Sequence, residues 1–275
     1  MNFKVFSVVK TASILLFVSK LIDFLIEKTD NTKDTKGGIK MKVELWSDFA
    51  CPFCYIGKKR FEKALENFAQ KDQVEIVYKA YQLNPNAPKV MKGTAYESFA
   101  KGHGTTPEAA KQKFAMFTEN AKTVGLEYNY DIIQMTNTFD AHRVAKYAAT
   151  VHLETEITDR FMKAYFSEGE NLSDFDTLVR LSSEVGLDET KVKEVLKKDE
   201  FSDIVKEQMM EGRQVGVRGV PFFVLNRKYG VSGAQQQEYF EQVLAQLWEE
   251  EQKDKLSTIG QADKGPVCDD ETCEI

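Results

Sequence analysis

Two cysteines, Cys51 and Cys54, lie two residues apart in the stretch CPFC. Pairs at this spacing bind a metal ion, form a structural disulfide or exchange disulfides with other thiols. A zinc site needs four ligands, and the three histidines of the chain show no ligand spacing around this pair: His103, His142 and His152. We therefore predict no metal site and interpret CPFC as a redox-active dithiol.

The dithiol lies between a strand-like run, KVELW, and a helix-like run that begins at Pro52. Proline suits the first helical turn, because a backbone N–H at that position would have no hydrogen-bond partner within the helix. Cys51 then falls at the helix N-terminus, where free backbone N–H groups and the helix dipole favour an anion such as a thiolate. We predict Cys51 as the catalytic nucleophile and Cys54, one turn further on, as the catalytic residue that resolves the mixed disulfide. Pro52 and Phe53 are predicted to support this active site.

A second motif, VRGVPFFVLN, places Val220 and Pro221 directly before another strand-like run. A strand, C-x-x-C and a helix in an α/β pattern are typical of thioredoxin-like folds, which place a cis-proline opposite the pair. We therefore predict a cis Val220–Pro221 bond that supports the active site, although only about 5–6% of X–Pro bonds are cis. The backbone of Val220 would bind an extended substrate segment by strand addition. Without the dithiol, a trans proline opening a strand would be the simpler interpretation.

The elements that must position these motifs follow from hydrophobic periodicity and from glycine and proline breaks. Strands are predicted at 42–46, 73–83, 220–226 and 229–233. Helices are predicted at 52–70, 94–102, 106–123, 139–153, 155–168, 174–185, 189–198, 201–215 and 235–252. Residues 41–84 and 200–252 would together form one sheet with helices on its faces, and residues 85–199 would be a helical insertion. The fold class is therefore α/β.

Three stretches together carry a resemblance to a known family: DFACPFCYIGKKRFEKAL, NTFDAHRVAKYA and VRGVPFFVLN. They resemble the DsbA-type thioredoxin-like oxidoreductase family, specifically its FrnE-like branch, over roughly residues 41–250. The resemblance implies a thioredoxin-like fold with a large all-helical insertion, and dithiol–disulfide oxidoreductase or isomerase activity. The same branch is related to the glutathione-dependent 2-hydroxychromene-2-carboxylate isomerases.

The predicted function is a thiol–disulfide oxidoreductase or isomerase that acts on protein or peptide substrates. It needs no bound cofactor, and glutathione or another low-molecular-weight thiol is a candidate redox partner. One alternative is a glutathione-linked isomerase of an aromatic small molecule, although an intact dithiol counts against it. The other is a redox-regulated chaperone or binding protein that holds clients with its helical block.

Several residues near the motifs have two interpretations. Trp46 and Phe49 are candidates for lining a substrate pocket, but they would serve equally well in the core. His142 lies in the AHR segment of the resemblance and is a candidate pocket residue rather than a catalyst. The basic run at 58–60 follows the dithiol by at least one helical turn, so we predict a solvated helix face there.

The remaining cysteines, Cys268 and Cys273, lie in the last eight residues. FrnE-like proteins can carry an extra pair near the C-terminus, so the resemblance implies an auxiliary redox pair on a mobile acidic tail, residues 253–275. Four acidic neighbours oppose thiolate formation by like-charge repulsion, which argues against a primary nucleophile there. A local disulfide, or free thiols without function, is the alternative.

The composition and the N-terminal residues limit the partners. The chain has 275 residues with a net charge of −6, which argues against a nucleic-acid partner. The apolar run at 11–19 is shorter than the ~20 residues of a membrane span, and no convincing signal-cleavage site follows it. We predict a cytoplasmic protein without a membrane partner, in which residues 1–40 are an extension that is disordered or weakly amphipathic. Export or membrane association through residues 1–40 is the alternative.

Overall fold

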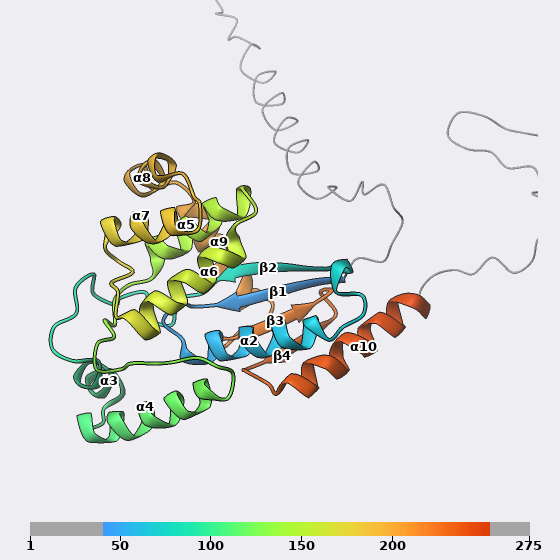
Figure 1. The fold of residues 1–275 in the computed structure, drawn as a ribbon, viewed down its shortest axis with the longest axis horizontal. Coiled ribbons are helices and arrows are strands. Elements are labelled where there is room, and N and C mark those ends of the chain that lie inside the picture. The colour runs from blue at the N-terminus through green and yellow to red at the C-terminus, as the bar shows by residue number, and fades with distance from the viewer. Residues whose placement is uncertain (1–40, 254–275) are drawn as a thin grey trace, which may run out of the picture. The chain divides into compact units, whose positions relative to one another are not determined.

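The computed structural model describes residues 41–253, and its centre is a four-stranded sheet in the order β2-β1-β3-β4 (Figure 1). The central strand β1 (Met41–Ser47) pairs in parallel with β2 (Val74–Ala80) and antiparallel with β3 (Phe222–Leu225). The edge strand β4 (Tyr229–Ser232) pairs antiparallel with β3. In β1 every residue except Lys42 is buried, as expected for a strand that is covered on both faces. The carboxyl end of this strand is therefore held firmly where the dithiol begins.

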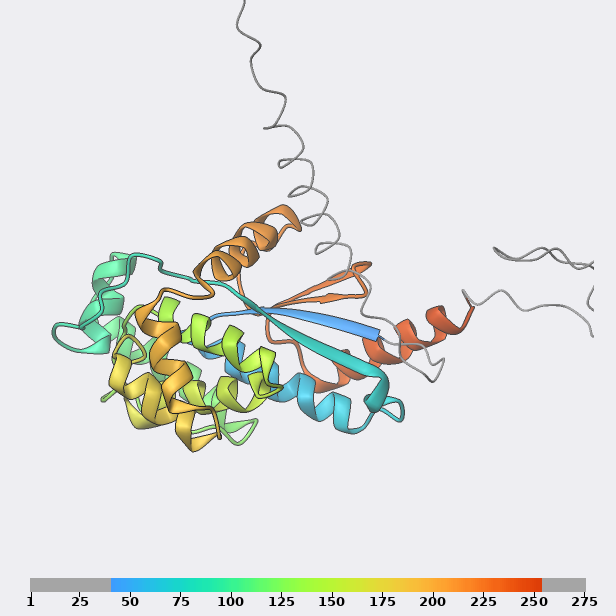
Figure 2. The same ribbon diagram turned by 90° about the horizontal axis from the view of Figure 1, so that it is seen from above.

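Helices cover both faces of the sheet. In Figure 2 the helices α2 (Pro52–Glu66) and α10 (Gln237–Lys253) lie on one side of the sheet, and α9 (Ser202–Gln214) lies on the other. Phe61 of α2 and Phe240 of α10 both contact Phe223 of β3 in the core beneath the sheet. Trp46, which is fully buried, donates its indole N–H to the Gln208 carbonyl of α9 at 2.9 Å.

The helical block lies between β2 and α9 in the chain. It consists of α3 (Ala95–His103), α4 (Pro107–Lys122), α5 (Phe139–Thr150), α6 (Glu154–Lys163), α7 (Phe175–Glu184) and α8 (Glu189–Lys197). Both figures show this block gathered near the end of the sheet where β1 runs into α2. Its largest hydrophobic cluster includes Cys51 and Cys54, so the dithiol lies where the sheet layer meets the helical block.

The observed α-helices and strands match the predicted ones in order, and two short helical turns were not predicted. One is a 3-10 turn, Lys71–Gln73, before β2, and the other lies inside the block. The helix predicted at 155–168 ends at Lys163, and a π-helical turn, Ala164–Glu168, follows. This turn buries both Tyr165 and Phe166. Hydrophobic periodicity assumes an α-helical pitch, so it cannot distinguish a local widening of this kind.

Candidate active site

The dithiol occupies the turn between β1 and α2. Cys51 is the N-cap of α2 with extended backbone angles, and Pro52 occupies the first helical turn, as predicted. The Cys51 N–H donates to the Asp48 carbonyl at 3.1 Å, and the Cys54 N–H donates to the Cys51 carbonyl at 3.0 Å. The turn therefore holds both cysteines, which are free thiols, at the start of the helix.

The cis-proline segment lies directly against Cys51. The Val220–Pro221 bond is cis, which confirms the prediction, and the Cys51 Sγ lies 3.5 Å from the Val220 carbonyl oxygen. A Cβ atom at Gly57 of α2 would come within 3.0 Å of the Pro221 Cγ. Glycine at this position therefore lets α2 approach the cis-proline segment closely.

Cys54 is completely buried behind Cys51. Burial raises the pKa of the Cys54 thiol well above its usual value, and the neighbouring Cys51 raises it further. The Asp48 N–H, 3.5 Å from the Cys54 Sγ, and the Ser47 hydroxyl act in the opposite direction and lower this pKa. Burial therefore favours the protonated form of the Cys54 thiol.

Asp48 is a structural element of the site that the sequence analysis missed. Its carboxylate is 1% exposed and accepts hydrogen bonds from the Ala50 N–H at 3.2 Å, the Thr138 hydroxyl at 2.8 Å and the Leu83 N–H at 2.7 Å. It therefore ties the dithiol turn to the loop after β2 and to the start of α5. Its position between a buried strand and the dithiol is the only signal that the sequence offered.

Two tyrosines from the segment after α4 approach the dithiol. The Tyr128 hydroxyl donates to the Pro52 carbonyl at 2.7 Å. The Tyr130 hydroxyl is buried and has no hydrogen-bond partner among the described residues. Burial is the main reason that the pKa values of both phenols are raised. Nothing in the local sequence marks these two residues, because their role depends on how the helical block packs.

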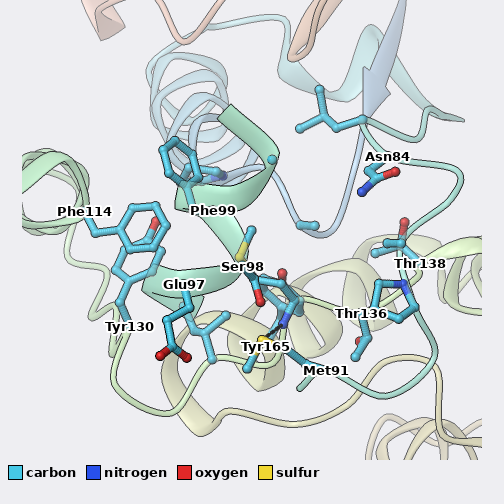
Figure 3. A pocket seen from close by; sticks show the side chains of 18 of the residues that line it. Asn84, Met91, Glu97, Ser98, Phe99, Phe114, Tyr130, Thr136, Thr138 and Tyr165 are labelled. Carbon is cyan, nitrogen blue, oxygen red and sulfur yellow. Dashed lines mark hydrogen bonds between the residues drawn. The ribbon is translucent and has the colours of Figure 1, made fainter. Parts of the chain in front are cut away.

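A cavity of about 890 Å³ lies beside the dithiol, and Ala50 and Pro52, the neighbours of Cys51, line it. Figure 3 shows Phe99, Phe114 and Tyr130 on one side of this cavity and Asn84, Thr136 and Thr138 on the other. Further lining side chains come from the loop after β2, from α3 and from the π-helical turn: Met91, Lys92, Lys101, Tyr165 and Phe166. The cavity is thus an apolar pocket with a few polar groups, as is usual for ligand sites.

The three candidate pocket residues do not line this cavity, and all three are buried. Trp46 is covered by α9, as described above. The ring of Phe49 packs between the rings of His142 and Phe161, with centroid-to-centroid distances of 4.6 and 5.6 Å. The His142 Nε2 lies 3.0 Å from the Tyr81 carbonyl oxygen. The helical block therefore encloses Phe49 and His142 at this end of the sheet.

The prediction of a solvated face at residues 58–60 is wrong. Lys58 is 1% exposed and pairs with Asp159 of α6 at 2.8 Å. Arg60 is also buried and donates to the Ala234 carbonyl at 2.8 Å and to the Asn120 side chain at 2.9 Å. The helical block packs against this face of α2, and charged side chains are buried there because each has a partner.

Other predictions fall outside the described part of the chain. Cys268 and Cys273 lie outside it, and so do residues 1–40. Between residues 41 and 253 no helix is long and apolar enough to span a bilayer. In the same range no three acidic, histidine or cysteine side chains come together as metal ligands would.

The model of the DSBA-like thioredoxin domain matches residues 42–245, which include both cysteines and the cis-proline. The chain belongs to the DSBA-like thioredoxin domain family. This DSBA-like domain is similar to a probable DsbA oxidoreductase from Streptomyces coelicolor, with 35% identity and a TM-score of 0.73. The match covers 86% of this chain and 99% of the other.

Two further proteins resemble this DSBA-like domain. The uncharacterised protein YwbO of Bacillus subtilis is 25% identical over 215 residues, which are 78% of this chain and 98% of YwbO. The cytosolic disulfide reductase DsbM from Pseudomonas aeruginosa shares the fold at 14% identity, with a TM-score of 0.52 over 76% of this chain and 99% of its own.

Taken with the family match, these likenesses confirm the thioredoxin-like α/β fold with its helical insertion and place the chain among DsbA-like thiol oxidoreductases. The FrnE-like branch stays a prediction, and so do the domain boundaries within residues 41–253.

Proposed function

We propose that Cys51 and Cys54 are the redox-active dithiol of a thiol–disulfide oxidoreductase or isomerase that acts on protein or peptide substrates. The observation that carries this proposal is the placement of Cys51 at the start of α2 with its Sγ against the Val220 carbonyl. Cys54 is buried one turn further along the helix. This arrangement suits a nucleophile followed by a protected resolving thiol.

The reaction needs only the two thiols and a substrate disulfide. The Cys51 thiolate attacks one substrate sulfur, a mixed disulfide forms, and the other substrate sulfur leaves as a thiolate. The Cys54 thiolate then attacks the Cys51 Sγ, which forms the Cys51–Cys54 disulfide and releases the second substrate thiolate. Two electrons pass from the enzyme dithiol to the substrate disulfide, and the reverse reaction oxidises a substrate dithiol.

The second step requires that Cys54 lose its proton, and the structure contains two groups that would assist it. The Asp48 N–H already points at the Cys54 Sγ. The Ser47 hydroxyl is buried, lowers the pKa of Cys54 and has no other hydrogen-bond partner among the described residues, so it can donate to a thiolate at Cys54. Hydrogen bonds to the charged form of a group favour that form.

The substrate segment would lie along Val220. This residue precedes β3 and is half-buried, so its main chain can pair with an extended peptide in the manner of an added strand. The electron donor would be a low-molecular-weight thiol. The fold relative DsbM, which has been solved with glutathione (GSH), supports glutathione as a candidate and the cytoplasm as the location.

The test is turnover in insulin reduction and in refolding of a scrambled disulfide substrate. Cys51→Ser should abolish both activities, and Cys54→Ser should trap mixed disulfides with the substrate. Retained turnover in Cys51→Ser would overturn the proposal. Wild-type protein that binds clients but shows no turnover in either assay would instead support a redox-regulated binding protein.

A second candidate function is favoured by the cavity. Its size and aromatic lining suit a small organic molecule better than they suit the surface of a protein substrate. Isomerisation of an aromatic small molecule would leave the dithiol without a clear part. If the substrate is instead a small disulfide, the cavity would bind it and the dithiol would react with it.

A further inference from the structure

We propose that the segment leading to Val220 binds acidic side chains, so that peptide disulfides flanked by Asp or Glu are preferred substrates. The binding surface consists of Arg213, Arg218 and the main chain of residues 218–220. This inference rests on the proposed redox function, because Cys51 and Cys54 carry out the chemistry. It adds the chemical class of the substrate, which the dithiol alone does not determine.

The segment meets the dithiol at Val220, whose carbonyl oxygen lies 3.5 Å from the Cys51 Sγ. Arg218 is two residues away, which is at most about 7 Å along the chain. A substrate segment that pairs with Val220 would run beside it at the ~4.8 Å spacing of neighbouring strands. The side chains next to the reacting cysteine of that segment would therefore come within reach of the Arg218 guanidinium.

The main chain of residues 218–220 is open for such pairing. Among the described residues, none accepts a hydrogen bond from the N–H groups of Arg218, Gly219 and Val220. Arg218 is exposed, and the two residues after it are half-buried. Strand addition requires main-chain groups of this kind, which are accessible and have no partner. A peptide can therefore pair with this segment and pass directly beside Arg218.

A turn brings Arg213 close to Arg218. The Val217 N–H donates to the Gly212 carbonyl at 2.8 Å, which closes the turn after α9. Arg213 directly follows the acceptor residue of this hydrogen bond, and Arg218 directly follows the donor residue. The two arginines thus begin from neighbouring points of the main chain, and both are exposed.

These two arginines differ from the others because they have no partner. Among residues 41–253, no group forms an ion pair or hydrogen bond with the guanidinium of Arg213 or Arg218. Every other arginine has such a partner: Arg60, Arg143, Arg160, Arg180 and Arg227. Glu211, the acidic residue nearest in the sequence, already pairs with Lys79 and Arg227. Two free guanidinium groups favour a carboxylate, which a guanidinium can bind with two parallel hydrogen bonds.

The probes are three blocked pentapeptides with a central cysteine, each used as its disulfide-linked dimer. The residue on either side of the cysteine is Glu, Gln or Lys, and the outer residues are Ser. In a single turnover, two electrons and two protons pass from Cys51 and Cys54 to the peptide disulfide. The peptide disulfide becomes two thiols, and a bond forms between the Sγ atoms of the two enzyme cysteines.

The rates are measured with the reduced full-length chain, in which Cys268→Ser and Cys273→Ser leave only the described dithiol to react. Division by the rate with dithiothreitol, a neutral dithiol, removes the intrinsic reactivity of each peptide. An ionic strength of about 0.15 M screens charges more than ~8 Å apart. We expect the Glu peptide to react about fivefold faster than the Gln peptide, equivalent to about 1 kcal/mol. The Lys peptide should react more slowly than the Gln peptide.

The variants identify the two arginines as the origin of this preference. Arg213→Gln/Arg218→Gln should remove the preference, and it should leave the rate with 2-hydroxyethyl disulfide unchanged because that substrate is neutral. The matched control is Lys63→Gln/Lys71→Gln, which changes the net charge by the same amount at exposed positions. These lysines lie in the last turn of α2 and just before β2, away from the dithiol, so the control should keep the full preference.

The outcomes separate the two proposals. Failure of the dithiol to reduce any of the peptide disulfides would overturn the redox function. Equal normalised rates for the Glu and Gln peptides, or a preference that survives in Arg213→Gln/Arg218→Gln, would overturn the acidic-substrate inference and leave the redox function intact. A preference that is lost to the same extent in the lysine control would also overturn it, because the effect would then come from the net charge.

Discussion

Around the dithiol, most close contacts involve main-chain atoms. The Cys51 Sγ faces the Val220 carbonyl, the Cys54 Sγ accepts from the Asp48 N–H, and the Pro52 carbonyl accepts from Tyr128. The walls of the neighbouring cavity are instead formed by side chains from loops and helices that are far apart in the sequence. Main-chain contacts survive most substitutions, so the chemistry is tied to the fold. Side chains can be replaced one at a time, so selectivity can change independently.

The largest effect should come from Cys51→Ser, which removes the nucleophile. Turnover in insulin reduction should fall by about a thousandfold or more, because the other thiol among the described residues, Cys54, is fully buried. The free energy of unfolding in urea should stay close to that of wild type. A folded variant that keeps its turnover would show that Cys51 is not the nucleophile.

The next largest effect should come from Asp48→Ala, which affects both regions. The substitution leaves the Thr138 hydroxyl and the N–H groups of Ala50 and Leu83 without their acceptor. We expect the free energy of unfolding in urea to fall by about 2–4 kcal/mol. Asp48→Asn keeps one acceptor oxygen and should lose less. Equal stability of Asp48→Ala and wild type would show that this carboxylate does not hold the two regions together.

A smaller effect is expected from Ser47→Ala, confined to the resolving step. Because the pKa of Cys54 is raised, its thiolate fraction and the rate of this step should increase as the pH rises through the alkaline range. Loss of the hydroxyl should raise that pKa further, shift the pH profile upward and slow resolution at pH 7 by roughly fivefold. Rapid-quench analysis of the mixed disulfide measures the step.

Ser47→Thr is the matched control for this prediction, since it keeps a hydroxyl at the same place. It should restore the wild-type pH profile. An unchanged profile in Ser47→Ala would show that the hydroxyl has no part in resolution, whatever the substitution does to stability.

The smallest effect should come from Tyr128→Phe. It removes the hydrogen bond to the Pro52 carbonyl but keeps the ring stacked on Phe166, 4.4 Å away between centroids. We expect a loss of about 1 kcal/mol in the free energy of unfolding and little change in disulfide preference. A large change in preference would mean that the main chain of the dithiol turn also shapes the cavity.

Much of the fold was predictable because its signals are local. The spacing of apolar residues identified the helices at 94–102 and 106–123, which the structure shows as Ala95–His103 and Pro107–Lys122. Threonine N-caps and a proline in the first turn account for these starts, as Thr94, Thr106 and Pro107 show. The cis bond at Pro221 was predictable only through its pairing with a distant dithiol.

The errors share one cause, which is packing between segments far apart in the chain. Lys58 and Arg60 looked like a solvated face because the sequence does not show that α6 supplies Asp159 or that Asn120 lies beside the helix. Trp46, Phe49 and His142 kept two interpretations, pocket or core, because burial cannot be read from residue type alone, and the structure buries all three.

By itself, the amino-acid sequence determined the type of chemistry. Two thiols separated by one helical turn, with a proline that starts the helix, suffice to specify a dithiol at a helix N-terminus, because helix geometry depends only on neighbouring residues. Tertiary structure alone decided what surrounds it. Asp48, Ser47 and Tyr130 acquire their roles only when β1, the loop after β2 and the helical block pack together, because burial and hydrogen bonding are properties of the assembled chain.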